Sequence, residues 1–215
     1  MGGQMEETKS ATGRRIFVYV DGFNFYFGLK SKRWKRYYWL DMWLLAERLA
    51  RRGRLESVKY FTACVRDNPP KELRQQAFLN ALRFHRPRLE IVYGHYLLKD
   101  VQCRKCANVW RTAEEKKTDV NIATHLLKDA FHDRFDTAIV VSGDGDLVPP
   151  VETIRVEMPT KRVTIAFPPN RFSADLQRAA TNFFHINQKA IRTSLLPDPV
   201  VKPDGAKLHK PAEWV

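Results

Sequence analysis

The sequence has few cysteines, no long apolar run and fewer acidic than basic residues. Its three cysteines, Cys64, Cys103 and Cys106, are too few for the disulfide framework of a small secreted domain. No apolar run approaches the roughly 20 residues that cross a bilayer, and the polar segment 1–13 lacks the apolar centre of a signal peptide. We therefore expect a soluble cytoplasmic protein with no membrane partner.

The shortage of acidic charge points to a polyanionic partner. The chain carries 24 Asp and Glu against 37 Lys and Arg, which gives a formal net charge of +13. Each phosphate that Lys or Arg neutralises releases condensed counterions, so such a surface favours nucleic acid. No basic amphipathic helix stands out, which argues against a membrane surface. Hydrophobic residues make up 44% of the chain, enough for a core, so wholesale disorder is excluded.

Short apolar runs alternate with helical stretches along most of the chain. The predicted strands cover residues 16–20, 58–64, 89–93, 137–141 and 162–167. The predicted helices lie between Asp41 and Gly53, over about 69–84, 113–131 and 149–157, and from Ser173 onward, with an irregular excursion at 94–112. This alternation predicts an α/β domain with a mostly parallel central sheet. We expect a flexible leader (1–13), one domain (14–195) and an extended, Pro-rich C-terminal tail (196–215).

Acidic residues follow two predicted strands at the point where each strand ends. Strand 16–20 runs into Asp21-Gly22-Phe23-Asn24, and strand 137–141 runs into Ser142-Gly143-Asp144-Gly145-Asp146. In open α/β sheets ligands bind beyond the carboxyl ends of the strands. We expect the glycines to let the backbone turn sharply and aim the acids into that crevice, with Ser142 as a turn residue. A lone aspartate there is more often a turn or cap residue, but two at apolar strand ends favour function.

The predicted helix 113–131 carries a third acid on its core-facing side. Its apolar stripe, extended toward the N-terminus in steps of three and four residues, reaches Asp119 and then Glu115. An inward carboxylate must be paired or must bind a cation. Lys116 or Lys117 is the alternative partner of Asp119. The residues of the stripe are Ile122, Ala123, Leu126, Leu127 and Ala130.

Carboxylates gathered in one crevice repel one another unless a cation neutralises them. Oxygen ligands suit Mg²⁺ or Mn²⁺ better than zinc. Such an ion stabilises charge on a phosphoryl oxygen and lowers the pKa of a bound water. An acidic crevice on a chain of net charge +13 therefore predicts hydrolysis of phosphodiester bonds.

Three segments together resemble the NYN domain family of PIN-like ribonucleases, in its bacterial form, over roughly residues 14–187. They are the strand ending in Asp-Gly-Phe-Asn, the segment EKKTDVNIATHLLKDA and the segment VVSGDGDLVPPV; the tail LLPDPVVKPDGAKLHKPAEW also resembles bacterial members. The resemblance implies a three-layer, PIN-like Rossmannoid domain that cleaves RNA with Mg²⁺ or Mn²⁺. It implies Asp21, Asp119 and Asp144 as the principal metal ligands. It also implies that Asn24 positions water or phosphate, and that Asp146 completes the site or fixes its loop.

A basic segment follows the first acidic motif and alternates with aromatic residues. Arg and Lys can hold a nucleic-acid backbone while aromatic faces stack on unpaired bases, which predicts binding of single-stranded RNA. The alternative is a solvated charged loop, with Tyr38 and Trp39 packed in the core, and for Trp39 the core position is favoured. The predicted RNA-binding residues are Lys30, Lys32, Arg33, Trp34, Lys35 and Arg36.

Cys103 and Cys106 form a CxxC pair, which is half of a four-ligand structural zinc site. No second pair exists, and only His95, Cys64 and His85 lie near it in sequence. A disulfide or two free thiols in a surface hairpin is therefore favoured over zinc, which stays an alternative.

Two other functions compete with the ribonuclease. The segment VSGDGDLV also resembles haloacid-dehalogenase-type phosphatases, but these need an acid two residues after the nucleophilic aspartate, where this chain has Phe23. An inactive RNA-binding module of the same fold would use the basic charge but would not need carboxylates that repel phosphate. Because Asp21, Asp119, Asp144 and Asp146 are all present, the sequence favours the metal-dependent ribonuclease.

Overall fold

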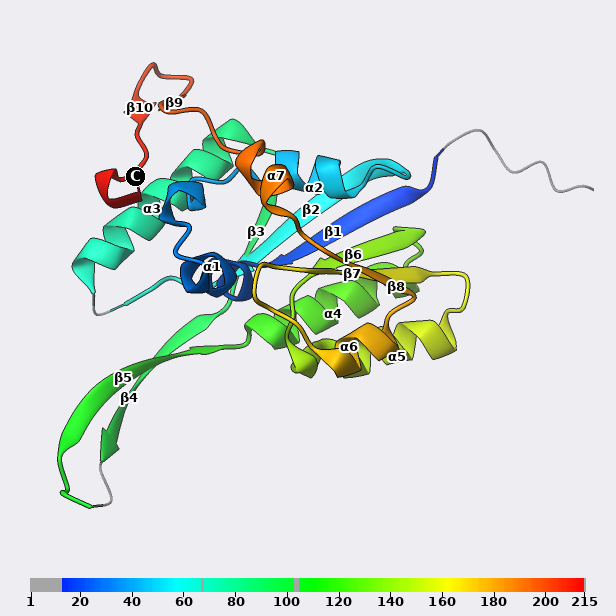
Figure 1. Cartoon of the computed structure of the whole chain (residues 1–215), viewed down its shortest axis with the longest axis horizontal. Coiled ribbons are helices and arrows are strands. Elements are labelled where there is room, and N and C mark those ends of the chain that lie inside the picture. The colour runs from blue at the N-terminus through cyan, green and yellow to red at the C-terminus, as the bar shows by residue number, and fades with distance from the viewer. Residues whose placement is uncertain (1–12, 67, 103–104, 215) are drawn as a thin grey trace, which may run out of the picture.

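A six-stranded parallel sheet forms the centre of the molecule (Figure 1). The computed structural model describes residues 13–66, 68–102 and 105–214. The strand order is β3-β2-β1-β6-β7-β8, so the chain builds outward from β1 in one direction and then from β6 in the other. The strands are β1 (Arg15–Asp21), β2 (Arg54–Thr62), β3 (Glu90–Tyr93), β6 (Thr137–Val141), β7 (Arg162–Phe167) and β8 (Asn182–His185).

Helices cover both faces of this sheet because alternate residues of its strands face two separate cores. In β1, Ile16, Val18 and Val20 belong to one core, while Phe17 and Tyr19 pack in the other. The first core takes its helical residues from α1 (Gly22–Ser31), α2 (Met42–Leu49), α3 (Pro69–His85) and α7 (Gln188–Arg192). The second takes them from α4 (Thr118–Phe131), α5 (Val148–Glu157) and α6 (Ala174–Ala179). The predicted three-layer α/β fold with a parallel sheet is confirmed. Within the described part of the chain, no helix is both long enough and apolar enough to cross a membrane.

The segment before α4 was predicted wrongly. In place of an irregular excursion and a helix from residue 113, β4 (His95–Gln102) and β5 (Val109–Lys116) form an antiparallel hairpin that projects from the sheet (Figure 1). The run of Glu and Lys at 114–117 has high helix propensity, but pairing with β4 continues as far as Lys116 and overrides it. Lys117 then adopts a left-handed conformation (φ 74°), and α4 begins at Thr118.

The Pro-rich C-terminal segment packs against the helices of the first core over its described residues. The Trp39 indole Nε1 donates to the carbonyl oxygen of Pro197 at 2.9 Å, and Leu40 forms a β-bridge with Leu195. Val200 is buried in the same core. The segment includes a short hairpin of β9 (Val200–Val201) and β10 (Lys207–Leu208), followed by the 3₁₀ turn η3 (Ala212–Trp214).

A buried ion pair attaches α4 to the sheet. Lys59 of β2 donates from Nζ to Asp129 Oδ2 at 2.6 Å, and Tyr19 of β1 donates from Oη to the same oxygen at 2.7 Å. The Asp129 side chain is fully buried and also accepts from Arg134. Burial raises the pKa of Tyr19 well above its usual value, and the charge of Asp129 raises it further, so Tyr19 remains a hydrogen-bond donor.

Replacing Asp129 with alanine is expected to lower the free energy of unfolding by about 3–5 kcal/mol, because Lys59 would lose its buried partner. The double substitution Lys59→Met with Asp129→Leu should recover much of this loss, since neither charge then stays buried. Urea unfolding followed by circular dichroism measures both. Asp175→Ala, which removes the exposed partner of Arg178, is the control and should have little effect. A loss in Asp129→Ala no larger than in the control would contradict the role of the pair.

Candidate metal centre

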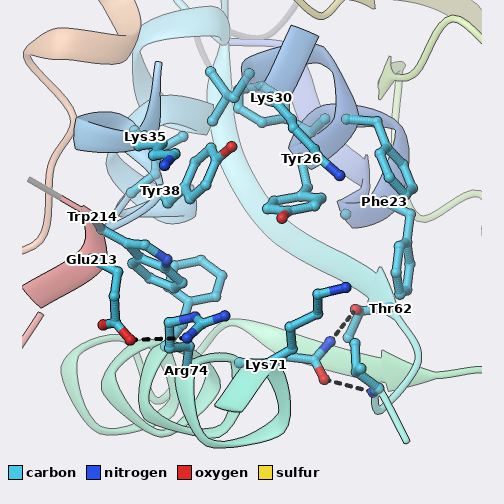
Figure 2. Close-up of a pocket in the computed structure, with 18 of the residues that line it drawn as sticks. Phe23, Tyr26, Lys30, Lys35, Tyr38, Thr62, Lys71, Arg74, Glu213 and Trp214 are labelled. Carbon is cyan, nitrogen blue, oxygen red and sulfur yellow. Dashed lines mark hydrogen bonds and ion pairs between the residues drawn. The ribbon is translucent and has the colours of Figure 1, made fainter. Parts of the chain in front are cut away.

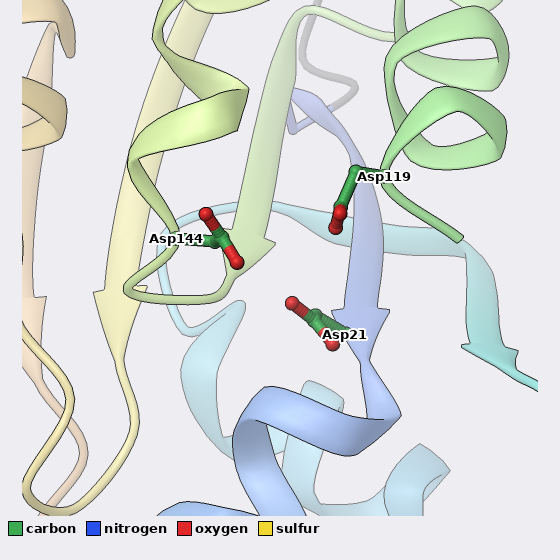
Figure 3. Close-up of side chains that lie close together, drawn as sticks. All are labelled: Asp21, Asp119 and Asp144. Carbon is green, nitrogen blue, oxygen red and sulfur yellow. The ribbon is translucent and has the colours of Figure 1, made fainter. Parts of the chain in front are cut away.

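Three aspartates from three elements converge at the carboxyl edge of the sheet. Asp21 ends β1, Asp144 follows β6, and Asp119 is the second residue of α4 (Figure 3). Strands β1 and β6 are parallel neighbours, with Val20 opposite Val141, so their ends bring Asp21 and Asp144 to the same place. One carboxylate oxygen from each aspartate lies within 4.8 Å of the others. The structure thus brings together the three residues that the resemblance implies as principal ligands.

Ser142 connects two of these aspartates. Its hydroxyl donates to Asp21 Oδ2 at 2.8 Å and accepts the backbone N–H of Asp144 at 3.1 Å. The Ser142 side chain is fully buried, whereas the sequence indicated only a turn residue. Asp21 uses its other oxygen, Oδ1, to cap α1 by accepting from the backbone N–H of Asn24 at 3.0 Å. The Asp21 carboxylate is therefore held in place from two sides.

The glycines beside the acids permit a close approach of backbone. Neither Gly22 nor Gly143 has a positive φ; among the described glycines only Gly205 does. Both lie where a side chain would not fit. A Cβ atom on Gly22 would lie 2.6 Å from the carbonyl oxygen of Phe61, and one on Gly143 would lie 2.9 Å from the backbone of Arg171. Gly22 and Gly143 therefore leave room for neighbouring backbone.

Two further predicted residues lie beside the convergence point. Asn24 accepts the backbone N–H of Gly143 through Oδ1 at 3.0 Å, which ties α1 to the loop after β6. Asp146 lies on the 3₁₀ turn η2 (Gly145–Leu147), is exposed, and donates its backbone N–H to Asp144 Oδ1 at 3.0 Å. Within the described residues, the converging group does not include Asp146.

The electrostatics of the cluster favour a bound cation. Burial raises the pKa of Asp119, and the negative charges of Asp144 and Asp146 raise it further. The three donors are all carboxylate oxygens, which suit a hard divalent ion. Two oxygens on opposite sides of Mg²⁺ lie about 4.2 Å apart, so oxygens already within 4.8 Å of one another need only small side-chain rotations to reach one ion. The residues present therefore fit a divalent metal.

The predicted RNA-binding residues divide into three groups. Lys30, Arg33 and Lys35 line a cavity beside α1. Lys32 and Arg36 are exposed, and the Arg36 guanidinium lies 4.9 Å from the ring centre of Tyr37. Trp34 is only partly exposed and packs against the first core. The expectation that Trp39 is a core residue is confirmed, since it is 1% exposed.

Of the CxxC pair, only Cys106 is described, and it lies in the loop between β4 and β5. Cys106 is exposed there, and Cys103 lies outside the described residues. The zinc and disulfide alternatives both stay predictions.

Comparison with known proteins identifies relatives of this chain. The NYN domain family model matches residues 15–187. A curated relative, 6-hydroxy-3-succinoylpyridine 3-monooxygenase HspA from Pseudomonas putida, is 27% identical over 238 residues, covering 93% of this chain and 75% of the relative. A solved structure of a protein of unknown function from Vibrio parahaemolyticus has a TM-score of 0.54 and 22% identity, covering 84% of this chain and 98% of that chain. The last similarity shows a shared fold alone.

The raised pKa of Asp119 predicts how pH and metal change stability. A carboxyl whose pKa is higher in the folded than in the unfolded state lowers the stability of the fold as pH rises through that raised pKa. Well below the unfolded pKa, near 3.8, it has no effect, because it is then protonated in both states. In EDTA at neutral pH, Asp119→Asn is therefore expected to raise the unfolding midpoint, and the difference should disappear as pH falls toward 3.8.

In the presence of metal, the wild type is expected to have a higher unfolding midpoint than Asp119→Asn. Mn²⁺ at about 100 times its dissociation constant stabilises a one-site protein by about 2.7 kcal/mol. We expect this gain in the wild type and in the control Glu157→Gln, an exposed carboxylate at the end of α5, but not in Asp119→Asn. Thermal unfolding in EDTA and in Mn²⁺ measures it. An equal Mn²⁺ gain in Asp119→Asn would show that this carboxylate does not hold the ion.

Proposed function

Because the chain belongs to the NYN domain family, we propose that it is a ribonuclease that hydrolyses phosphodiester bonds of single-stranded RNA with Mg²⁺ or Mn²⁺. The observation that carries this proposal is the convergence of Asp21, Asp119 and Asp144 within 4.8 Å at the carboxyl edge of the sheet. A structural role alone would not favour three mutually repelling carboxylates at one point. The domain is proposed to cover residues 14–195.

The three aspartates would hold the ion, and the residues around them would keep them in position. A bound divalent ion activates water and stabilises the charge that develops on a phosphate oxygen. Ser142 fixes Asp21 through its hydroxyl, and Asn24 fixes the loop that carries Asp144 through Gly143. This preorganisation matters because small errors in ligand placement weaken catalysis strongly. Asp146 is proposed to fix the loop through its bond to Asp144 and to add negative charge beside the ion.

The charge of the whole chain supports a nucleic-acid substrate. The net charge of +13 attracts a polyanion, whereas the carboxylate cluster repels phosphate until a cation neutralises it. Lys30, Arg33 and Lys35 lie on and after α1, which begins directly after Asp21. A phosphate backbone held by these cations would pass beside the metal centre.

The name of the Pseudomonas relative raises oxidation as a competing chemistry. Non-haem iron oxygenases hold their metal with two histidines and one carboxylate. In the described part of this chain, the converging group consists of carboxylates alone. That donor set favours a hydrolytic Mg²⁺ or Mn²⁺ ion, so the ribonuclease is preferred.

Asp144→Asn is expected to lower RNA cleavage by about 100-fold or more, because one ligand to the ion loses its charge. Binding of RNA should be kept or strengthened, since one repulsive carboxylate has gone. The assay uses end-labelled single-stranded RNA with Mg²⁺, Mn²⁺ or EDTA, and Glu157→Gln is the matched control, expected to cut normally. Products should carry 5′-phosphate ends. If the wild type binds RNA but leaves it intact in both metals, the chain is an RNA-binding module instead.

Replacing Lys32, Arg33, Lys35 and Arg36 with alanine is expected to weaken RNA binding and flatten its salt dependence. The slope of log affinity against log salt should fall by about 0.7 for each phosphate that the variant no longer neutralises. Arg51 and Arg52, exposed just before β2 and therefore near the opposite edge of the sheet, provide the control when replaced with alanine. Fluorescence anisotropy over a salt series measures both. Equal slopes in the two variants would make the segment an ordinary solvated loop.

A further inference from the structure

A large cavity lies beside the metal centre, between α1 and α3. Its volume is about 1210 Å³, above the roughly 300–1,000 Å³ of pockets that hold drug-sized ligands. Gly22 and Phe23, which follow Asp21 directly, line it, and so does Thr62, which ends β2. The cavity therefore extends from the carboxyl edge of the sheet, next to the aspartates, into the layer of helices on one face.

Aromatic rings from separate elements form much of its wall (Figure 2). The ring centres of Tyr26 and Tyr38 lie 5.0 Å apart, and those of Tyr38 and Trp214 lie 5.6 Å apart. Phe78 of α3 lies 6.2 Å from Trp214. Tyr26 is 37% exposed and Phe27, whose ring centre lies 5.4 Å away, is 41% exposed, so the wall includes contiguous aromatic surface open to solvent. Such a wall suits a planar ring that can stack on it.

Positive charge surrounds these rings. Among the described residues that line the cavity, Glu213 is the only acid, and it is bonded to Arg74 at 2.9 Å. Lys71 extends into the cavity (Figure 2). Burial raises the pKa of Tyr38 to about 12, with Tyr26 adding to the shift, so Tyr38 contributes no negative charge near neutral pH. The ligand should therefore be anionic as well as planar. The lining cations are Lys30, Arg33, Lys35, Arg66, Lys71 and Arg74.

We infer that this cavity binds an unpaired nucleobase and its phosphate from the RNA strand beside the bond that is cut, an inference that rests on the proposed ribonuclease function. A base can enter only if it is unstacked and unpaired, so the cavity would make the enzyme selective for single strands. The aromatic surface includes Tyr26, Tyr38 and Trp214, whereas Trp34 is not among the described residues that line the cavity. The volume favours a segment of a polymer over one small ring acid.

The binding experiment needs no metal and no cleavage. Adenosine 5′-monophosphate and ribose 5-phosphate are titrated separately, in EDTA, against the full chain by calorimetry, and each is tested as a competitor of labelled single-stranded RNA. Base–aromatic stacking is worth about 1–3 kcal/mol, so the nucleotide should bind roughly 5- to 150-fold more tightly than the sugar phosphate. Equal binding of the two would show charge attraction alone and overturn the inference. Nicotinate, an aromatic carboxylate, is titrated in the same way. If nicotinate binds more tightly than the nucleotide, the inference is also overturned.

Variants connect the binding to this cavity. Trp214→Ala and Tyr26→Ala should each remove most of the preference for the nucleotide; Tyr26 is partly exposed, so its variant tests the inference even if loss of Trp214 disturbs the fold. Lys71→Gln should weaken the binding of the nucleotide and of the sugar phosphate by the same factor. Phe131→Ala, exposed at the end of α4, is the aromatic control. An unchanged preference in Tyr26→Ala would overturn the inference, while RNA cleavage measured separately would still decide the proposed function.

Discussion

Repulsion between Asp21, Asp119 and Asp144 is the constraint on which the arrangement of this molecule depends. Carboxylates this close disfavour the fold when all are charged. Burial raises the pKa of Asp119, and the charge of Asp144 raises it further. The stabilising free energy comes from two apolar cores on the faces of the sheet, and the buried pair of Lys59 with Asp129 fixes the position of α4. The site is thus a locally unfavourable arrangement supported by a favourable scaffold, as is common where a protein is built for binding.

The positions of opposite charge bear on how the molecule would bind the proposed RNA substrate. The carboxylates occupy the edge where β1 and β6 end, and the cations of the cavity lie on and after α1 and on and before α3. A polyanion would be drawn to the cations without a metal, but its phosphate could approach the aspartates only once an ion neutralised them. The proposed RNA binding and RNA cleavage would therefore depend differently on the divalent ion. Binding to the cations would not need the ion, whereas cleavage at the aspartates would.

Local signals in the sequence predicted most of the fold, and long-range contacts account for what it could not predict. Strands 137–141 and 162–167 match β6 and β7 because apolar, β-branched runs bounded by polar residues have few alternatives. Asp21 and Asp144 could be placed because they follow such runs. The start of α4 could not, because pairing across a hairpin overrides helix propensity. Trp214 joins the cavity wall through contacts with residues far away in the chain, which no local pattern records.

The hydrogen bond from Ser142 to Asp21 joins residues 121 positions apart, and this has a consequence for the rate of folding. The entropy lost on closing a loop grows with the logarithm of its length, and long-range parallel pairing is intrinsically slow. The β4–β5 hairpin joins neighbouring residues and can form early, whereas β6 must dock beside β1 before the aspartates meet. The carboxylates of Asp21 and Asp144 would thus remain apart, and free of mutual repulsion, until β6 has docked beside β1.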